Sequence, residues 1–252
     1  MRHFPPLILF VARNTITFVV KAFSFIYLLP IFFFSCTSNE IGNSKDVNPE
    51  RIYFDYKVRG DERDTSVTLY LQYRMGGPNG TTLVVDPPAK VQLDSEIIPV
   101  DSARLSGAYY EIQKRSQSFA GRHSILFTDV NNKQYDQQFI YQPFKLKTRI
   151  PATINRGDLA FDFSGLANED YIRVILTDTS FMSKDIHEID TVKNNRLVVT
   201  ADKLKNLTDG PITLQFYKEI EKPIRNGTKE GGRISISYGL QREFELRSPQ
   251  TP

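Results

Sequence analysis

The chain has 252 residues, of which 32 are Lys or Arg and 29 are Asp or Glu, giving a formal net charge of +3. The three excess basic residues, Arg2, Arg13 and Lys21, all precede position 36, so the rest of the chain is neutral. A neutral chain lacks the basic surface that nucleic acid binding requires, and we expect no nucleic acid partner. The single cysteine, Cys36, excludes a disulfide within the chain. Tryptophan is absent, whereas 18 Phe and 12 Tyr favour strands.

An apolar segment, residues 22–34, follows the last of these basic residues and is followed by a small residue, Ser35, and then Cys36. A basic region, an apolar stretch and a small residue at the cleavage point are the parts of a secretory signal. This segment resembles the signals of bacterial lipoproteins, in the looser form found in Bacteroidetes-type envelope lipoproteins. The resemblance implies that residues 1–35 are removed as a signal peptide. It also implies that the thiol of Cys36 carries diacylglycerol, whose palmitate-type chains hold the mature protein to a membrane.

Two alternatives remain for this segment, an uncleaved anchor helix and a buried free cysteine. A helix that spans a bilayer needs about 20 apolar residues, and the segment here is shorter and contains Pro30. By resemblance to envelope sorting rules, Thr37 in place of Asp after the cysteine implies the outer membrane. Only one acid, Glu40, follows closely, so the side of that membrane, periplasm or cell surface, stays open. We expect residues 36–50 to form a polar, flexible tether.

From residue 51 onward, apolar and polar residues alternate with the period of half-buried strands. Turn signals, such as the pair Asn131-Asn132, separate the segments. In the first half, strands are predicted at residues 52–58, 67–73, 82–85, 90–93, 96–100, 108–112, 124–129 and 134–141. The pattern restarts after a proline-containing junction at 142–151, with strands at 159–163, 171–177, 196–199, 212–217, 233–238 and 242–246. A helical turn is expected at 201–207, with Thr200 as its N-cap.

Short strands at this spacing, without a long helical pattern, predict an all-β fold of the sandwich or barrel type. The two halves also share a weak repeat. Residues 54–56 (FDY) and the strand after them resemble residues 161–163 (FDF) and their next strand, and 121–127 (GRHSILF) resembles 210–216 (GPITLQF). Most of the chain resembles bacterial immunoglobulin-like or fibronectin-like modules. The expected fold is therefore two tandem β-sandwiches of this type, at 51–143 and 144–248, followed by a disordered tail at 249–252.

One segment of the second half, residues 218–232, is charged and rich in turn residues (KEIEKPIRNGTKEGG). We expect it to be a long polar loop that does not pack. Loops of this length in a compact domain are often functional, and the alternative is a mobile decoration.

No catalytic motif is present, neither a nucleophile elbow, nor a zinc-protease motif, nor a phosphate-binding glycine loop. We therefore expect no enzyme activity, no cofactor and no metal site. His123 lies near the start of a predicted strand and is interpreted as structural. The cluster of His187 with the acids at 185, 188 and 190 is interpreted as a solvated acidic edge, with a Ca²⁺ or Zn²⁺ loop as the alternative.

Three short patterns bear on surface chemistry. Arg-Gly-Asp occurs at 59–61 and at 156–158, where we expect turns, and turn chemistry explains it better than adhesion. The triplets at 101–103 (DSA) and 190–192 (DTV) resemble the O-glycosylation sequence of Bacteroidetes-type envelope proteins, which implies that Ser102 and Thr191 are modified. Of the adjacent pair Tyr109 and Tyr110, one must face the core, and the other is placed to stack on a sugar.

These observations predict a non-enzymatic lipoprotein that is held to the membrane through Cys36. It would present β-sandwich domains to a glycan or to another envelope protein. A first alternative is a fimbrial or adhesin-like subunit that assembles by strand exchange, with residues 242–246 as the exchanged strand. A second alternative is a hydrolase built on a sandwich scaffold.

Overall fold

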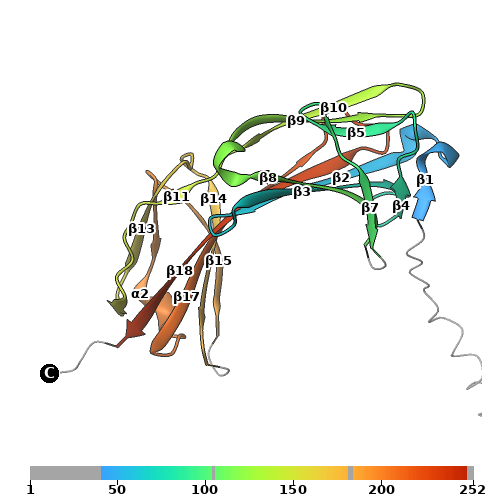
Figure 1. Ribbon diagram of the computed structural model, residues 1–252. Helices are drawn as coiled ribbons and strands as arrows, with labels where there is room; N and C mark the ends of the chain where they lie inside the picture. The colour runs from blue at the N-terminus through green and yellow to red at the C-terminus, as the bar shows by residue number, and fades with distance from the viewer. Residues whose placement is uncertain (1–40, 104–105, 181–183, 249–252) are drawn as a thin grey trace, which may run out of the picture. The chain divides into compact units, whose positions relative to one another are not determined.

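The computed structural model describes residues 41–103, 106–180 and 184–248, and the described part is nearly all strand. Cys36 and the signal segment lie outside the described residues. The strands form three sheets (Figure 1). The largest contains β1 (Ile41–Asn43), β4 (Thr81–Val84), β3 (Ser66–Met75), β2 (Ile52–Asp61), β18 (Gly232–Arg247), β17 (Gly210–Pro223), β14 (Tyr171–Asp178) and β15 (Ile186–Thr191), together with β7 (Val100–Ala103), β8 (Gly107–Arg115) and β12 (Thr153–Asn155). The second contains β10 (Gln134–Tyr141), β9 (Gly121–Thr128), β5 (Lys90–Leu93) and β6 (Glu96–Ile97), and the third β11 (Lys145–Leu146), β13 (Leu159–Ser164) and β16 (Arg196–Val199). Short helices are η1 (Ser44–Asp46), η2 (Pro49–Arg51), η3 (Ser116–Ser118) and α2 (Ala201–Leu204).

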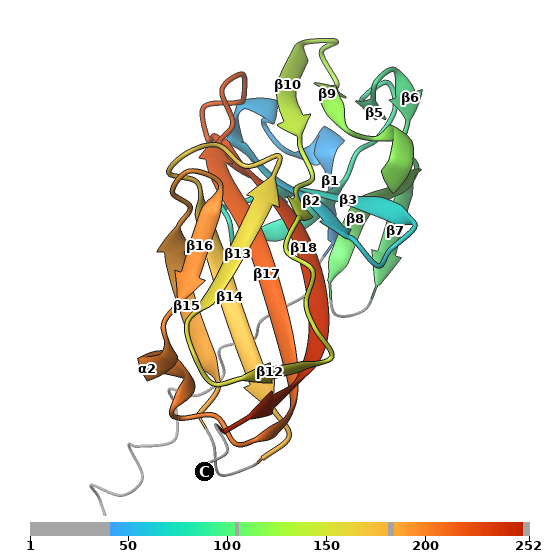
Figure 2. The same ribbon diagram turned by 90° about the vertical axis from the view of Figure 1, so that its left-hand side faces the viewer.

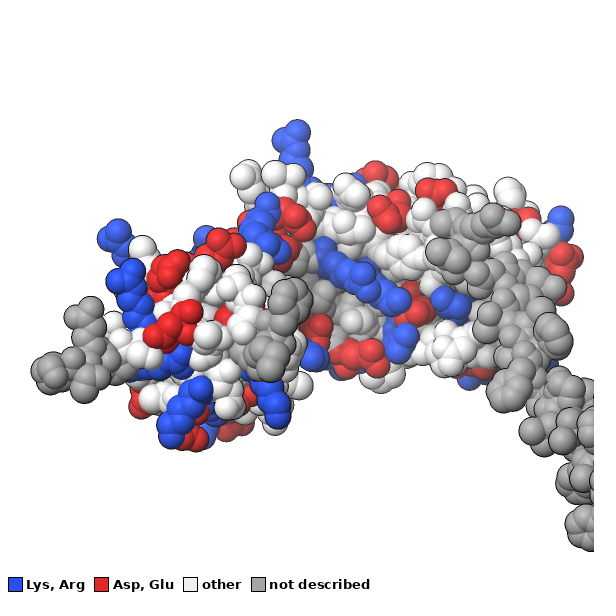
Figure 3. All heavy atoms as spheres, turned by 90° about the horizontal axis from the view of Figure 1, so that it is seen from below, with Lys and Arg blue, Asp and Glu red and all other residues white. Residues whose placement is uncertain are grey.

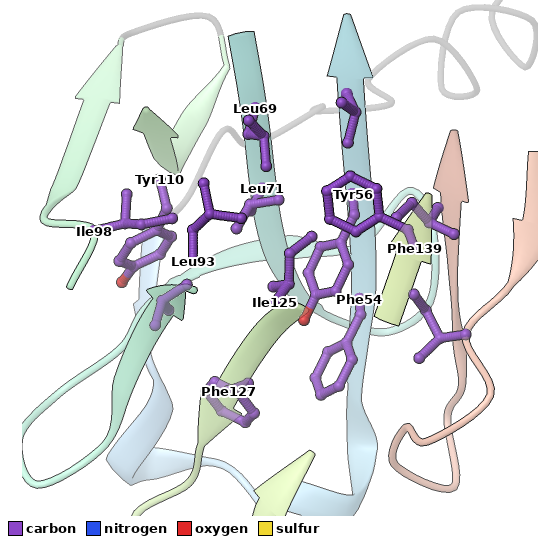
Figure 4. Close-up of a cluster of buried hydrophobic side chains, with 14 of the residues drawn as sticks. Phe54, Tyr56, Leu69, Leu71, Leu93, Ile98, Tyr110, Ile125, Phe127 and Phe139 are labelled. Carbon is purple, nitrogen blue, oxygen red and sulfur yellow. The ribbon is translucent and has the colours of Figure 1, made fainter. Parts of the chain in front are cut away.

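The first core lies between the sheet β7-β8-β3-β2 and the sheet β10-β9-β5-β6. Phe54 on β2 is its centre, with ring centroids 5.3 Å from Tyr73, 5.3 Å from Phe127 and 5.7 Å from Tyr135. Phe127 and Tyr135 come from the opposite sheet, so their edge-to-face contacts with Phe54 join the two layers. Figure 4 shows Phe54 and Phe127 on strands of the two sheets. Each such ring pair contributes about 0.5–1.5 kcal/mol beyond its buried area.

The second core lies between β11-β13-β16 and the sheet formed by β15, β14, β17, β18 and β12. Phe216 on β17 meets Phe161 and Phe163 of β13 edge to face, with ring centroids 5.0 and 5.1 Å apart. In Figure 2, β13 and β16 lie across the face of β14 and β17. Each of β13, β14 and β17 buries one face, as the alternation of apolar residues in its sequence predicts.

The long hairpin β17–β18 belongs to both cores. Along its whole length β18 pairs with β17, and its first half, residues 232–239, also pairs in parallel with β2. Ile234 belongs to the first core and Leu240 to the second, and Tyr238 packs against both. The strands predicted at 233–238 and 242–246 are therefore one strand. The buried side chains Ile234, Leu240 and Phe244 all lie on one face, which therefore continues through residues 239–241, the gap between the two predictions.

The segment 218–232, expected to be an unpacked polar loop, is a structured part of the first sandwich. Residues up to Pro223 continue β17, and Ile224 and Thr228 at the hairpin tip are buried. Thr228 Oγ1 donates a hydrogen bond to the carbonyl of Ile52, 2.6 Å away. The expectation was wrong because the charged residues of this segment alternate with the few that face inward.

Residues 41–50, expected to be part of a flexible tether, also pack on the first sandwich. β1 pairs in parallel with β4, and Ser44 is buried and accepts a hydrogen bond from the N–H of Asp86 at 2.9 Å. Glu50 contacts Lys133 at 2.7 Å. The low hydrophobicity of this segment did not indicate an ordered structure, because the segment is held by backbone and side-chain hydrogen bonds rather than by a hydrophobic face.

The all-β prediction is confirmed, and the strand order is that of immunoglobulin-like sandwiches. The first core has β7-β8-β3-β2 facing β6-β5-β9-β10, which corresponds to strands D-E-B-A and C′-C-F-G. The division of the chain into two independent domains stays a prediction, because β18 is part of both halves.

The internal repeat is confirmed in one place and wrong in another. β9 and β17 occupy equivalent positions, each between two antiparallel neighbours, and each begins at a glycine of nearly equal φ, +133° at Gly121 and +136° at Gly210. By contrast, β2 and β3 are neighbours in one sheet, whereas β13 and β14, their proposed equivalents, lie in different sheets. The similarity of the FDY and FDF segments reflects strand composition alone.

Candidate ligand-binding face

The outer face of β2, β3 and β8 carries a pair of stacked tyrosines. The rings of Tyr70 and Tyr109 lie 4.9 Å apart at 22°, and Lys57 Nζ lies 5.8 Å from the centre of the Tyr70 ring. These side chains share a face because residues alternate along each strand and Lys57 is registered opposite Tyr70. Tyr70 thus contacts a second aromatic ring and lies within cation–π distance of an ammonium, and both contacts favour this position of its ring.

Tyr109 is fixed in turn by a carboxylate. Its hydroxyl donates to Asp101 Oδ2 at 3.1 Å, from the neighbouring strand β7. This hydrogen bond, with the charge of Asp101, raises the pKa of Tyr109 above its ordinary value. The hydroxyl therefore stays protonated at neutral pH and remains a hydrogen-bond donor.

A second group of polar side chains continues this face toward β18. Asp55, only 2% exposed, accepts a hydrogen bond from Arg233 Nε at 2.9 Å, and Lys57 Nζ lies 3.8 Å from the same carboxylate. The bond to Asp55 raises the pKa of Arg233. Nearby, the Gln72 amide donates to the carbonyl of Ser106 at 2.7 Å. A buried carboxylate that is paired twice gives a rigid polar surface rather than a free reactive group.

This face points downward in Figure 1, below the strands β5, β9 and β10, and is viewed directly in Figure 3. Acidic and basic side chains are interspersed across it among uncharged surface. This face places fixed hydroxyls, an ammonium group and aromatic ring edges next to one another. Such groups recognise polar, uncharged ligands by hydrogen bonds and ring contact.

The two adjacent tyrosines are divided as the alternation predicts. Tyr110 faces the core, where its hydroxyl accepts the N–H of Val85 at 2.6 Å, and burial raises its pKa to about 12. Tyr109 faces outward. The contribution of Tyr70 was missed because nothing along the chain indicates which tyrosine of β3 lies beside Tyr109.

The two predicted glycosylation residues share a local geometry. The N–H of Ser102 donates to Asp101 and that of Thr191 donates to Asp190, both at 2.7 Å. Ser102 is exposed on β7 and Thr191 is half-buried at the end of β15. In both places the aspartate orients the backbone of the residue that would be modified, and the modification itself stays a prediction.

His123 makes structural contacts with both ring nitrogens. Nδ1 lies 2.7 Å from Asp94 Oδ2, Nε2 lies 2.8 Å from the carbonyl of Phe119, and the ring stacks on Phe119 at 3.8 Å. The other predicted cluster is dispersed along β15. His187 lies 3.9 Å from Asp185, but Glu188 instead contacts Lys203. Within the described residues, no group of three or more His, Cys, Asp and Glu gathers around a common point.

The second Arg-Gly-Asp tripeptide binds helix α2 through its side chains and does not form a turn that is open to solvent. Arg156 donates to the carbonyls of Leu204 and Leu207, the latter at 2.6 Å, and pairs with Asp209 at 2.7 Å. Asp158 accepts the N–H of Ala201 at 2.8 Å. Thr200 occupies the N-cap position as predicted, but its side chain makes no capping bond, because Asp158 takes that place. The first tripeptide lies at the end of β2, not in a turn.

Comparisons with known proteins do not assign this chain to a family. No family model and no curated protein matches it. Solved structures match at low similarity. The two immunoglobulin domains IG1+IG2 of DIP-gamma match with 11% identity and a TM-score of 0.21, covering 74% of this chain and 97% of that one. A tetra-tandem repeat from the extending region of a large adhesion protein matches with 16% identity and a TM-score of 0.25, covering 76% and 49%.

A third similar structure is SGBP-B of the Bacteroides ovatus mixed-linkage glucan utilization locus, in complex with a heptasaccharide. It has 11% identity, a TM-score of 0.20, and coverage of 75% of this chain and 60% of that one. At such TM-scores, function must be argued from the residues of this chain. Among the residues that the structure describes, no helix has the length and apolar character to cross a bilayer.

Proposed function

We propose that the mature chain is a non-enzymatic, lipid-anchored protein of the bacterial outer membrane that binds a glycan at the face formed by Lys57, Tyr70 and Tyr109. The observation that carries the proposal is the stacked tyrosine pair, with Asp101 and Lys57 at its two ends. Sugars bind through hydroxyl groups and the apolar faces of their rings, and this surface offers partners for both.

Binding is tested with the purified protein on immobilised envelope and plant polysaccharides. Tyr70→Ala and Tyr109→Ala are expected to weaken retention by about tenfold, since aromatic contacts of this kind contribute about 1 kcal/mol or more. Tyr171→Ala is the matched control, because Tyr171 is 68% exposed on β14 in the other half of the chain. If no polysaccharide is retained, or if the three variants behave alike, this face is not the glycan site.

The anchor is tested separately. Cys36→Ala is expected to release the protein from membranes or to leave a longer, uncleaved precursor, because the acyl chains need the thiol. Fractionation and gel migration equal to those of the unchanged protein would contradict lipidation. A C-terminal tag on intact cells that is lost to external protease would place the protein on the surface, and protection would place it in the periplasm.

Strand exchange, the first alternative, would require β18 to leave its partners. Residues 242–246 pair with β17 on one side, and residues 245–247 pair with β12 on the other. No structural feature of the described residues favours a hydrolase.

A further inference from the structure

A groove of about 600 Å³ lies between strand β10 and the hairpin β17–β18. Two contacts close its ends. At one end, Gln137 accepts the N–H of Arg225 at 2.9 Å, and at the other the rings of Tyr141 and Tyr238 lie 6.2 Å apart. Between them the groove has an apolar lining that includes Phe139, Ile140, Ile220, Ile234 and Ile236.

One wall of this groove is an open strand edge. β10 is the outermost strand of its sheet and, among the described residues, pairs only with β9. Natural proteins usually protect such an edge with lysine, proline or a bulge. β10 (QYDQQFIY) contains neither lysine nor proline, and Ile140 is 58% exposed beside the groove. In an edge strand every second residue directs its N–H and C=O away from the paired neighbour, and on β10 the carbonyl of Gln138 accepts the side-chain amide of Gln137 at 2.6 Å.

The rim of the groove is basic. Four of its residues are cationic, and Asp136 is the acid. Lys218 is paired with Asp170, and Arg122 contacts Gln138 at 3.4 Å. Lys222 and Arg225 are exposed, and within the described residues neither side chain makes an ion pair. The two cations that are available to a ligand thus stand on the hairpin, facing the open edge.

We propose that this groove binds an acidic peptide segment in extended conformation, which adds to β10 as a further strand. Main-chain hydrogen bonds to β10 supply affinity, and carboxylates of the peptide pair with Lys222 and Arg225. From Gln137 to Tyr141, at about 3.3 Å per residue, the groove accommodates about four to five residues. A peptide fits better than an acidic glycan, because only a peptide repeats donors and acceptors at the spacing of the strand edge. The site is separate from the tyrosine face on β3 and β8.

The probe is a fluorescein-labelled eight-residue peptide of alternating glutamate and threonine, with an alternating lysine and threonine peptide as its charge-reversed control. Fluorescence anisotropy with the purified protein is expected to detect the acidic peptide only. Lys222→Glu combined with Arg225→Glu should weaken binding by about tenfold or more, because attraction becomes repulsion. Lys90→Glu, an exposed lysine on β5 outside the groove, should leave binding unchanged.

Hydrogen exchange distinguishes strand addition from attraction by charge alone. Amides of β10 are expected to exchange more slowly when the acidic peptide is bound, and those of β6 are not. Ile140→Glu offers a second variant in which an exposed side chain gains a repelling charge without loss of a core contact. Equal binding of both peptides, unchanged exchange in β10, or displacement by a sulfated oligosaccharide with no protection of β10 would each overturn the proposal.

Discussion

The hydroxyl of Tyr141 occupies the space into which a side chain at Gly60 would project. A Cβ built on Gly60 would lie 1.8 Å from that oxygen and 3.1 Å from the ring carbon that bears it. Tyr141 ends β10, Gly60 lies near the end of β2, and the Tyr141 ring contacts Tyr238 where the two cores adjoin. Within the described part of the chain, the buried hydroxyl has no hydrogen-bond partner.

Gly60→Ala should therefore destabilise the protein by about 1–3 kcal/mol, because the added methyl group overpacks the junction. Tyr141→Phe removes the oxygen, and we expect it to be neutral or slightly stabilising because an unpaired buried hydroxyl is lost. The double variant should recover most of the stability lost in Gly60→Ala. Urea unfolding measures all three, and a double variant no more stable than Gly60→Ala would refute this account of the contact.

Arg156→Ala should lower stability by about 2 kcal/mol, because the carbonyls of Leu204 and Leu207 and Oδ1 of Asp209 lose the guanidinium that donates to them. Arg156→Lys should not restore it, since an ammonium cannot reproduce the forked geometry of a guanidinium. The control is Arg59→Ala in the first Arg-Gly-Asp, an exposed residue that should change stability by at most about 0.5 kcal/mol. Equal losses at both positions in thermal unfolding would contradict the prediction.

Ile224→Ala at the hairpin tip should destabilise the first sandwich by about 2–4 kcal/mol, although it lies far along the chain from that core. We expect the whole protein to unfold in one transition, because β18 connects both cores. Hydrogen exchange of β2 amides in the variant measures the effect directly, with the exposed neighbour Lys229→Ala as control. A variant in which only the amides of the second core lose protection would show that the hairpin does not stabilise the first.

Stability should fall in acid through aspartates that are ion-paired when folded. Hydrogen bonds from Arg196 at 2.7 and 3.1 Å hold the pKa of Asp162 below its ordinary value of 3.8. The backbone N–H of Ser248, and then Arg156, lower the pKa of Asp209. A lowered pKa in the folded state contributes stability that is complete above the unfolded pKa and is lost as the pH falls through the folded value.

The expected result is a stability that is constant from neutral pH down to about 5 and declines below about 4. Asp162→Asn should flatten part of this decline, because its side chain no longer titrates. Chemical unfolding at pH values from 7 to 2.5 measures both profiles. An acid decline of equal steepness in Asp162→Asn would mean that this aspartate does not contribute.

The sequence by itself determined where most of the longer strands are and which way their side chains face, but it gave no prediction of β1, β7, β11, β12 or β15. The period of two located β3, β10, β13 and β16 within a residue or two and the start of β2, and the turn at Asn131-Asn132 was predicted from its residue types. Alternation also separated Tyr109 from Tyr110. These features depend on neighbours in the chain, and local sterics and hydrophobic periodicity are sufficient for them.

Only the tertiary structure decided which strands pair and which side chains meet. The period of a strand shows that one face is buried but does not say against which partner. The extension of β18 across both cores, the meeting of Tyr70 with Tyr109, and the anchoring of α2 by Arg156 all join residues that are distant in sequence. The open edge of β10 likewise could be recognised only from the pairing of all the other strands, because an edge strand is one that has no paired neighbour on one side.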